Sequence, residues 1–235
     1  MSPESSWPET AVVTGGASGI GAAIVALLEA DGVDVEVLDL RHGFDVANPR
    51  DWEAVTPADV VCLNAGVDVG DSDIRVLGDD AYRRIMGANV DGVVFGVRQL
   101  AGLMRPGSAF VVTASLAGLT PMPEDPVYTL TKHAVVGFVR AVAPQLAERG
   151  IRINAICPGF ADTPLVGEAS KQRFRAAGFP LLQPEEVAAA ALAAARSEET
   201  GQAWFVQPGR PAEPFRFPRV PGPRVEGEGA VEPPR

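Results

Sequence analysis

The stretch TGGASGIG, residues 14–21, holds four glycines, follows a short apolar run and leads into an alanine-rich segment. A strand that ends in a glycine turn before a helix gathers unpaired backbone N–H groups at the positive end of the helix dipole. Gly15 would permit the tight turn, Gly19 the close approach of a phosphate, and Gly21 the close packing of helix on strand. The spacing G-x-x-x-G-x-G differs from the dinucleotide fingerprint G-x-G-x-x-G, so a plain strand–helix connection is the alternative. The stretch predicts a diphosphate site.

Apolar runs bounded by turn residues recur along the whole chain. Most are continuous rather than alternating, which is typical of strands that are covered on both faces. Helical segments lie between them, and this alternation predicts an α/β fold: a Rossmann-like, doubly wound parallel sheet in a single domain. The predicted strands cover residues 10–14, 33–39, 58–64, 108–115, 151–157 and 202–207, and the predicted helices cover residues 19–30, 49–55, 88–104, 127–148 and 184–195.

Two departures from a regular alternation are visible. Only a few residues, LRHG, separate the second apolar run from the next segment, FDVAN, so we expect one crossover helix to be shortened or missing. The last 28 residues hold 8 of the 21 prolines and predict an extended, proline-rich C-terminal tail over residues 208–235. Phe215 and Phe217 in this tail need a surface, and we expect a neighbouring subunit to supply it. Residues 1–9 are expected to be disordered, which leaves residues 10–207 as the dinucleotide-binding catalytic domain.

Composition excludes several classes of function. A net charge of -10 repels nucleic acid and anionic lipid surfaces. The first ten residues lack the pattern of a signal peptide, and no run has the ~18 apolar residues of a membrane span, so we expect a cytoplasmic protein without membrane or nucleic-acid partners. Cys62 and Cys157 lie in apolar runs and are expected to be buried, reduced thiols. With only two histidines besides, no metal site is expected.

Asp39 ends the second apolar run, 18 residues after Gly21. An acidic residue near this distance hydrogen-bonds the adenosine ribose in dinucleotide sites, and its charge repels a 2′-phosphate. Ser18 occupies the point in the loop where a basic residue would favour that phosphate. Arg41 is a possible phosphate partner, and a solvated strand-end carboxylate is the alternative role of Asp39. The pattern favours NAD over NADP.

Tyr128 and Lys132 are four residues apart at the start of a helical segment, so both lie on one face of the helix. A phenol has an ordinary pKa of about 10, and a neighbouring ammonium lowers this pKa by favouring the phenolate. The pair could therefore serve as a general acid and base. Taken alone, this spacing can also arise from composition without any function.

With these motifs in place, the sequence resembles the short-chain dehydrogenase/reductase family over about residues 10–207. The matching motifs occur in the family's order along the chain. They are TGGASGIG at 14–21, Asp39, Asp45 with Val46, NAG at 64–66, NVDG from Asn89, SLAG from Ser115, YTLTK at 128–132 and PGFADT at 158–163.

The resemblance implies a role for each matching residue. Tyr128 would be the acid/base, Lys132 would tune it and bind the nicotinamide ribose, Ser115 would bind the reacting oxygen, and Asn89 would complete a water-linked proton relay. The alternatives without a catalytic role are a hydroxyl at the end of a strand for Ser115 and a helix N-cap for Asn89. In the cofactor site that the resemblance implies, Asp45 and Val46 would contact the adenine, Asn64, Ala65 and Gly66 would form the wall of the cleft, and Thr163 would hold the nicotinamide carboxamide. The other implied cofactor-binding residues are Gly15, Ser18, Gly19, Ile20, Gly21, Asp39, Tyr128, Lys132, Pro158 and Gly159.

The expected activity is hydride transfer between NAD(H) and a secondary alcohol or ketone. Mostly apolar candidate pocket residues favour a hydrophobic small-molecule substrate, and residues 160–182 are expected to form a lid over it. Two alternatives stay open: a 3-oxoacyl thioester reductase that uses NADPH, and a non-catalytic dinucleotide sensor. The nearly all-apolar helix over residues 88–104 predicts a homo-oligomer, either a dimer or a tetramer.

Overall fold

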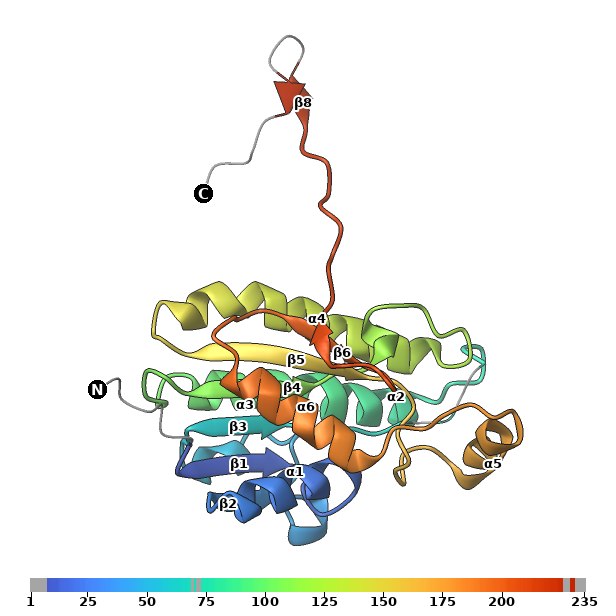
Figure 1. Ribbon diagram of the computed structural model, residues 1–235, viewed down its shortest axis with the longest axis horizontal. Helices are drawn as coiled ribbons and strands as arrows, with labels where there is room; N and C mark the ends of the chain where they lie inside the picture. Colours follow the sequence, from blue (N-terminus) through green and yellow to red (C-terminus); the bar gives the residue numbers. More distant parts are fainter. Residues whose placement is uncertain (1–7, 69, 71–72, 226–228, 231–235) are drawn as a thin grey trace.

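The computed structural model describes residues 8–68, 70, 73–225 and 229–230. Most of the segment predicted to be disordered, residues 1–7, lies outside these ranges. A seven-stranded sheet forms the centre of the molecule, in the order β2-β1-β3-β4-β5-β6-β7, with all pairs parallel except β6 with β7 (Figure 1). The strands are β1 (Thr10–Thr14), β2 (Asp34–Leu38), β3 (Val60–Leu63), β4 (Ala109–Thr113), β5 (Arg152–Pro158), β6 (Ala203–Val206) and β7 (Glu213–Pro214). The predicted Rossmann-like α/β fold is confirmed.

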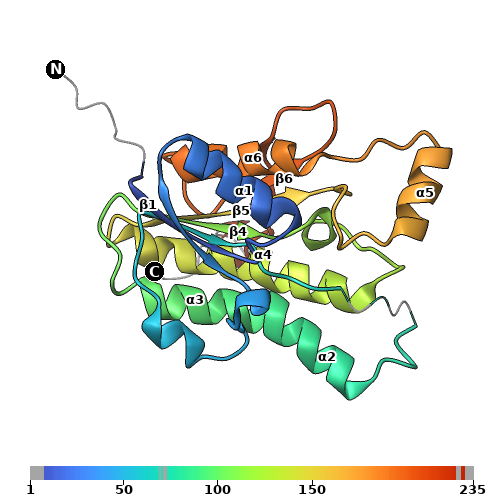
Figure 2. The same ribbon diagram turned by 90° about the horizontal axis from the view of Figure 1, so that it is seen from below.

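Helices cover both faces of this sheet, as the continuous apolar strands predict. Figure 2 shows α1 (Gly19–Ala30) and α6 (Pro184–Arg196) on one face, and α3 (Gly92–Leu100) and α4 (Pro126–Ala147) on the other. Each face has its own apolar core, because strand side chains alternate between them. The core beside α3 and α4 is the larger of the two and includes Trp52 and Phe110.

The predicted helix over residues 88–104 is part of a longer helical run. It begins with α2 (Asp79–Met86), passes through a π-helical turn at Gly87–Asp91, and continues as α3 to Leu100. Charged residues fill α2, so the search for apolar runs missed it. The helix α5 (Glu168–Ala176) was missed for the same reason, since none of its residues is buried.

The connection between β2 and β3 confirms that one crossover helix is missing. Two short 3₁₀ turns replace it, at Leu40–His42 and Asp51–Ala54. Trp52 fills the space that a helix would occupy: it is buried, its Nε1 donates to the Val46 carbonyl at 2.9 Å, and its ring meets Phe44 edge-on at 5.2 Å.

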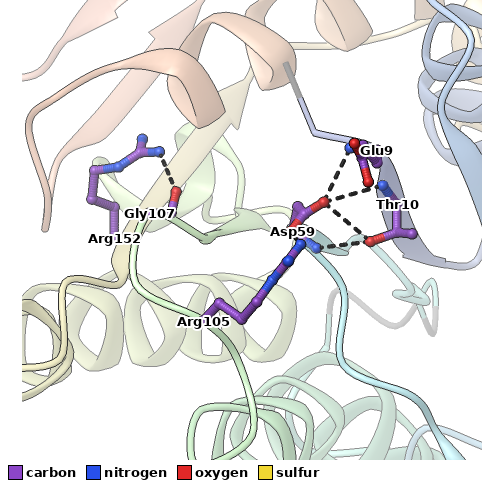
Figure 3. A network of polar contacts seen from close by, with 6 residues as sticks. All are labelled: Glu9, Thr10, Asp59, Arg105, Gly107 and Arg152. Carbon is purple, nitrogen blue, oxygen red and sulfur yellow. Dashed lines mark hydrogen bonds and ion pairs between the residues drawn. The ribbon is translucent and has the colours of Figure 1, made fainter. Parts of the chain in front are cut away.

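A polar network holds the amino-terminal edge of the sheet (Figure 3). The Asp59 carboxylate, just before β3, accepts from the amides of Glu9 and Thr10 at 3.0 and 3.3 Å and from Arg105 at 2.6 Å. Although burial opposes it, these bonds hold the Asp59 pKa below its ordinary value. We assign this network a structural role, because ligands of open α/β sheets bind at the opposite edge of the sheet.

The C-terminal tail returns to the protein's own sheet. β7 pairs with β6, the Phe215 amide donates to the Ala203 carbonyl at 2.7 Å, and the Arg140 guanidinium lies 3.7 Å from the centre of the Phe217 ring. The expectation that Phe215 and Phe217 need a neighbouring subunit is therefore wrong for these two residues. Between residues 208 and 225 the tail contains no helix, and a two-residue strand pair, β8 (Arg224–Val225) with β9 (Gly229–Ala230), follows.

Both cysteines are buried and free, as expected. No helix in the described ranges is long and apolar enough to cross a membrane.

Candidate active site

The candidate residues converge on one edge of the sheet because they follow the carboxyl ends of neighbouring parallel strands. The glycine loop follows β1, Asp39 follows β2, Asn64 follows β3, Ser115 follows β4, and Gly159 follows β5. This edge, beside the reversal of strand order between β1 and β3, is where open α/β sheets bind ligands.

The glycines of the loop are required by close backbone contacts. A Cβ on Gly21 would lie 2.1 Å from the Gly15 carbonyl oxygen and 2.6 Å from Asn64 Nδ2. A Cβ on Gly15, which has a φ of +66°, would lie 2.9 Å from the Ala65 Cα. These distances confirm that α1 packs tightly against the turn. They also place the first turn of α1 directly beside the end of β3.

The N-terminus of α1 fits the diphosphate predicted from sequence. Ser18 occupies the N-cap position but makes no side-chain cap bond, and the first turn carries no acidic residue. Thr163 closes the other side of the loop, because a Cβ on Gly19 would lie 3.2 Å from the Thr163 Cβ. The amides of this 12-residue helix thus face a cradle between the loop and the segment after β5.

Asp39 lies against the glycine loop, where a ribose would be bound. Its Oδ2 accepts from the Ala17 amide at 3.1 Å, and its Oδ1 accepts from the Arg41 amide at 2.9 Å. The Arg41 side chain turns to the same loop and donates to the Ala17 carbonyl at 3.2 Å. A carboxylate and a guanidinium therefore both lie against the glycine loop.

Asn64 joins three strands at the carboxyl edge of the sheet. Its Nδ2 donates to the Thr14 carbonyl at 3.2 Å, and its Oδ1 accepts from the Thr113 hydroxyl at 3.0 Å. The Thr14 hydroxyl in turn accepts from the amides of Asn64 and Ala65 at 2.9 and 3.0 Å. Thr14 and Thr113 were not among the predicted site residues. Each is the last residue of a parallel strand, and this position could have identified them from sequence as part of the site.

Asn89 lies in the π-helical turn and is only 1% exposed. Its side chain accepts from the Val67 amide at 2.8 Å and donates to the Val67 carbonyl at 2.9 Å and to the Thr131 hydroxyl at 3.1 Å. It therefore ties the loop after β3 to α4. Single π-turns inside α-helices are frequently found at functional sites.

Ser115, Tyr128 and Lys132 come together at the centre of the edge. Tyr128 hydrogen-bonds Ser115. The Lys132 ammonium lies 5.4 Å from the centre of the Tyr128 ring and donates to the Thr113 carbonyl at 3.0 Å. The predicted helical spacing of Tyr128 and Lys132 on one face is confirmed by this geometry.

Burial dominates the acidity of these groups. It raises the pKa of Tyr128 above its ordinary value, against the opposing hydrogen bond from Ser115, so the lowered phenol pKa predicted from sequence is not found. Burial also lowers the pKa of Lys132 to about 8. Cys157, behind the pair on β5, has its pKa raised by burial to about 12 and stays a neutral thiol.

Four of the remaining predicted residues follow the strands β2 and β5 or end them. Val46 packs in the core, which leaves its backbone and the exposed Asp45 for an adenine. Pro158 ends β5, and Gly159 packs between Leu116 and Gln207. The described residues contain no cluster of three metal-ligating side chains.

The predicted lid carries α5 away from the sheet (Figure 1). Phe160 stacks on Phe174 with ring centres 4.4 Å apart, and Asp162 forms ion pairs with Lys171 at 2.6 Å and Arg175 at 3.2 Å. These contacts hold the start of the predicted lid, just after β5, against α5.

Sequence reasoning missed Asp125, which caps α4. Its Oδ1 accepts from the Tyr128 amide at 2.9 Å and so fixes the first turn of the helix. Burial, together with a hydrogen bond that the protonated Asp125 donates to Asp68, raises the pKa of Asp125 to about 7. The sequence pattern D-P at a helix start is the indication that could have identified this cap.

Asp125→Asn is expected to raise stability increasingly as the pH rises. The wild-type carboxyl has a pKa of about 7 in the folded chain, against an ordinary value of 3.8. Its contribution to the free energy of unfolding is therefore fully present below about pH 4 and is lost as the pH rises through 7. Asparagine keeps the oxygen acceptor but never ionises. Allowing for solvent screening of a partly exposed carboxyl, we expect the variant's melting temperature to exceed the wild type's by roughly 2–4 °C at about pH 8. A difference that is independent of pH would contradict this assignment.

A family model described as enoyl-(acyl carrier protein) reductase matches residues 50–209, which is more than half of the chain. The chain belongs to the short-chain dehydrogenase/reductase family. The resemblance drawn from the ordered motifs is thereby confirmed. The chain's family is one of oxidoreductases that use nicotinamide dinucleotides.

Several characterised relatives act on alcohols. The chain is 34% identical to a 3beta-hydroxysteroid dehydrogenase 2 of Eggerthella lenta over 66% of this chain and 72% of the relative. It is 31% identical to a cyclohexanol dehydrogenase of an Acinetobacter species over 77% of this chain and 84% of the relative. A solved 3-ketoacyl-(acyl-carrier-protein) reductase of Brucella melitensis, complexed with NADH, is 26% identical, with a TM-score of 0.75 over 86% of this chain and 98% of that one. These matches support alcohol oxidoreductase activity in the family member described here.

Proposed function

We propose that this short-chain dehydrogenase/reductase interconverts a hydrophobic secondary alcohol and its ketone with NAD(H). The observation that carries the proposal is the cluster of Ser115, Tyr128 and Lys132 beside the glycine cradle. A phenol, a hydroxyl and an ammonium converge there within reach of one substrate oxygen. Bound at the cradle, the nicotinamide dinucleotide would supply the hydride acceptor or donor.

Tyr128 and Ser115 act on the reacting oxygen of the substrate. In oxidation Tyr128 takes the hydroxyl proton, and in reduction it returns that proton to the same oxygen. Ser115 donates a hydrogen bond that steadies the oxygen while negative charge develops on it. The existing hydrogen bond between the two side chains supports this division of roles.

Lys132 provides the positive charge that this chemistry needs. Its pKa of about 8 leaves it mainly protonated at neutral pH, and its Nζ is fixed by the Thr113 carbonyl. The raised pKa of Tyr128 keeps the phenol protonated until substrate and cofactor are bound. Proton removal in the oxidative direction then depends on the cations around the phenol. Asn89 holds the loop after β3 against α4 through its side-chain hydrogen bonds, and its proposed part is to complete a water-linked proton relay.

NAD is the proposed cofactor because the Asp39 carboxylate lies against the glycine loop, where its charge would repel a 2′-phosphate. Asp39→Asn removes this charge while keeping hydrogen bonds to the loop. We expect the ratio of kcat/KM for NAD over NADP to fall by about tenfold or more, which corresponds to ~1.4 kcal/mol. Arg41→Gln is the matched control and should leave the ratio unchanged or raise it. An unchanged ratio in Asp39→Asn would contradict the role of this carboxylate.

A 3-oxoacyl thioester reductase that uses NADPH is the second candidate. It is favoured by Arg41, whose guanidinium lies at the loop and could turn to a 2′-phosphate. The acidic balance of the chain disfavours binding to an acidic carrier protein.

The activity test is a panel of cyclic and open-chain secondary alcohols with NAD and, separately, NADP, followed by the absorbance of the reduced nicotinamide. A set of 3-oxoacyl thioesters with NADH and NADPH runs beside it. Turnover of hydrophobic alcohols with NAD is the expected result. Preferred turnover of thioesters with NADPH would overturn the proposal in favour of the second candidate.

A further inference from the structure

Two carboxyl groups from separate segments of the chain meet beside Tyr128. Asp68 lies in the loop after β3, and Asp125 is the N-cap of α4. The protonated Asp125 donates a hydrogen bond to Asp68. Ionised carboxylates only accept hydrogen bonds, so this bond exists only while one of the two groups holds a proton. We call these two residues the carboxyl pair. The pair carries one negative charge while the proton is held and two charges after it is lost.

Each member of the carboxyl pair is also bonded to backbone. Asp125 Oδ1 accepts from the Tyr128 amide at 2.9 Å, and Asp68 Oδ1 accepts from the Gly70 amide at 2.8 Å. The pair is therefore a second link between the loop after β3 and α4, in addition to the link through Asn89 farther along the helix. Unlike the amide of Asn89, the pair can be joined or parted by a single proton.

The charge of the carboxyl pair acts on the phenol of Tyr128. Burial is the largest cause of the raised pKa of Tyr128, and the negative charges of Asp68 and Asp125 raise this pKa further. The pKa of Asp125 is about 7, so the second negative charge of the pair develops near neutral pH. Ionisation of the pair therefore makes the proton of the phenol harder to remove.

Other titratable groups surround the phenol and the pair. Burial raises the pKa of Cys157 to about 12 and lowers the pKa of Lys132 to about 8. Asp73, farther along the loop, pairs with Arg75 at 2.7 Å. The charged or titratable groups on the π-turn, on α2 and at the start of α4 are exposed, and they include Asp79, Asp80, Arg83, Asp91, Glu124 and His133. The carboxyl pair and Lys132 are thus two sources of a charge change close to the phenol near neutral pH, and a test has to separate them.

We propose that Asp68 and Asp125 hold one proton between them, and that this proton positions Tyr128 and makes its phenol easier to ionise. With the proton in place, the loop after β3 is joined to the start of α4, and the pair bears a single negative charge. When the proton passes to solvent, two like charges face each other across this link and oppose formation of the phenolate. Both residues act through Tyr128 and are positioning residues. Their effect on catalysis rests on the proposed function, whereas their effect on the environment of the phenol does not.

Carbon-13 NMR of the tyrosine rings tests the pair without any turnover. The chain has two tyrosines, so Tyr82→Phe identifies the signal of Tyr128. In the wild type this signal should shift with an inflection near pH 7, as the pair ionises. The inflection should disappear in Asp125→Asn and move to lower pH by about one unit or more in Asp68→Asn, because each variant removes one charge and keeps a hydrogen-bonding side chain. A step caused by Lys132 would stay in both variants.

The pH dependence of alcohol oxidation tests the effect on catalysis. At about pH 9 the wild-type pair bears two charges and each asparagine variant bears one, so kcat/KM of both variants should exceed that of the wild type about threefold or more. At about pH 6 all three proteins bear one charge there, and their values should agree within about twofold. Glu124→Gln is the matched control, since it removes an exposed carboxylate next to Asp125. It should follow the wild type in both measurements.

The two measurements distinguish failure of this inference from failure of the proposed function. A wild-type Tyr128 signal without an inflection near pH 7, or the same inflection in both asparagine variants, would overturn the inference whatever the protein turns over. Variants whose kcat/KM relative to wild type does not change with pH would also overturn it, because a purely structural pair behaves in that way. If no alcohol is oxidised at all, the proposed function fails, and the NMR titration still decides whether the carboxyl pair controls Tyr128.

Discussion

Tyr128→Phe is expected to lower kcat by about 10²–10⁴-fold, because it removes the hydroxyl proposed to carry the proton. The loss should appear in kcat and kcat/KM together, since the hydroxyl is needed mainly in the transition state. Phenylalanine fills the same space on α4, so neither the Asp125 cap bond to the backbone nor the Lys132 bond to Thr113 is touched. Steady-state kinetics with the best alcohol from the panel measures the effect.

Cofactor titration is the control for Tyr128→Phe. The glycine cradle and Asp39 are unchanged in the variant, so its dissociation constant for NAD should stay within a few-fold of wild type. A variant that binds NAD normally yet keeps more than about a tenth of wild-type kcat would show that another group moves the proton.

Gly21→Ala is expected to damage the cradle itself. The added methyl group would lie 2.1 Å from the Gly15 carbonyl oxygen and 2.6 Å from Asn64 Nδ2, so α1 must move away from the turn. Overpacking of this kind costs about 1–3 kcal/mol, or roughly 2–4 °C in melting temperature for each kcal/mol. Because the same shift displaces the amides at the start of α1, NAD binding should weaken by at least about tenfold.

Gly137→Ala is the matched control, since Gly137 lies inside α4 with no atom within 4 Å of an added Cβ. This change should stabilise the protein by about 0.5–1 kcal/mol and leave NAD binding unaltered. Equal effects of the two substitutions on NAD binding would show that Gly21 has no particular role at the cradle.

The parts of this molecule that were predictable from sequence are those dictated by local pattern. Continuous apolar strands, glycines at a strand–helix junction and a Tyr–Lys pair at helical spacing each depend on residues close together in the chain. They suffice for the sheet, the edge that bears the site, and the placing of Tyr128 and Lys132 on one helix face, whereas Ser115 was named only through the family resemblance.

The parts that were missed depend on contacts between distant segments. Asp125 gains importance only because its cap bond holds the Tyr128 amide, and Thr14 only because the end of β3 lies beside it. Charged helices such as α2 carry no apolar run to reveal them. The predicted direction of the pKa shift of Tyr128 was wrong, because the sequence shows the neighbouring cation but does not show that the phenol is buried.

The most direct test of the proposed activity follows the hydride itself. A secondary alcohol deuterated at the carbinol carbon, taken from the panel, is incubated with the protein and NAD, and the reduced cofactor is analysed by mass spectrometry. The account predicts deuterium on the nicotinamide ring with wild type and almost none with Tyr128→Phe. Reduced cofactor without deuterium, or equal labelling in both proteins, would contradict it.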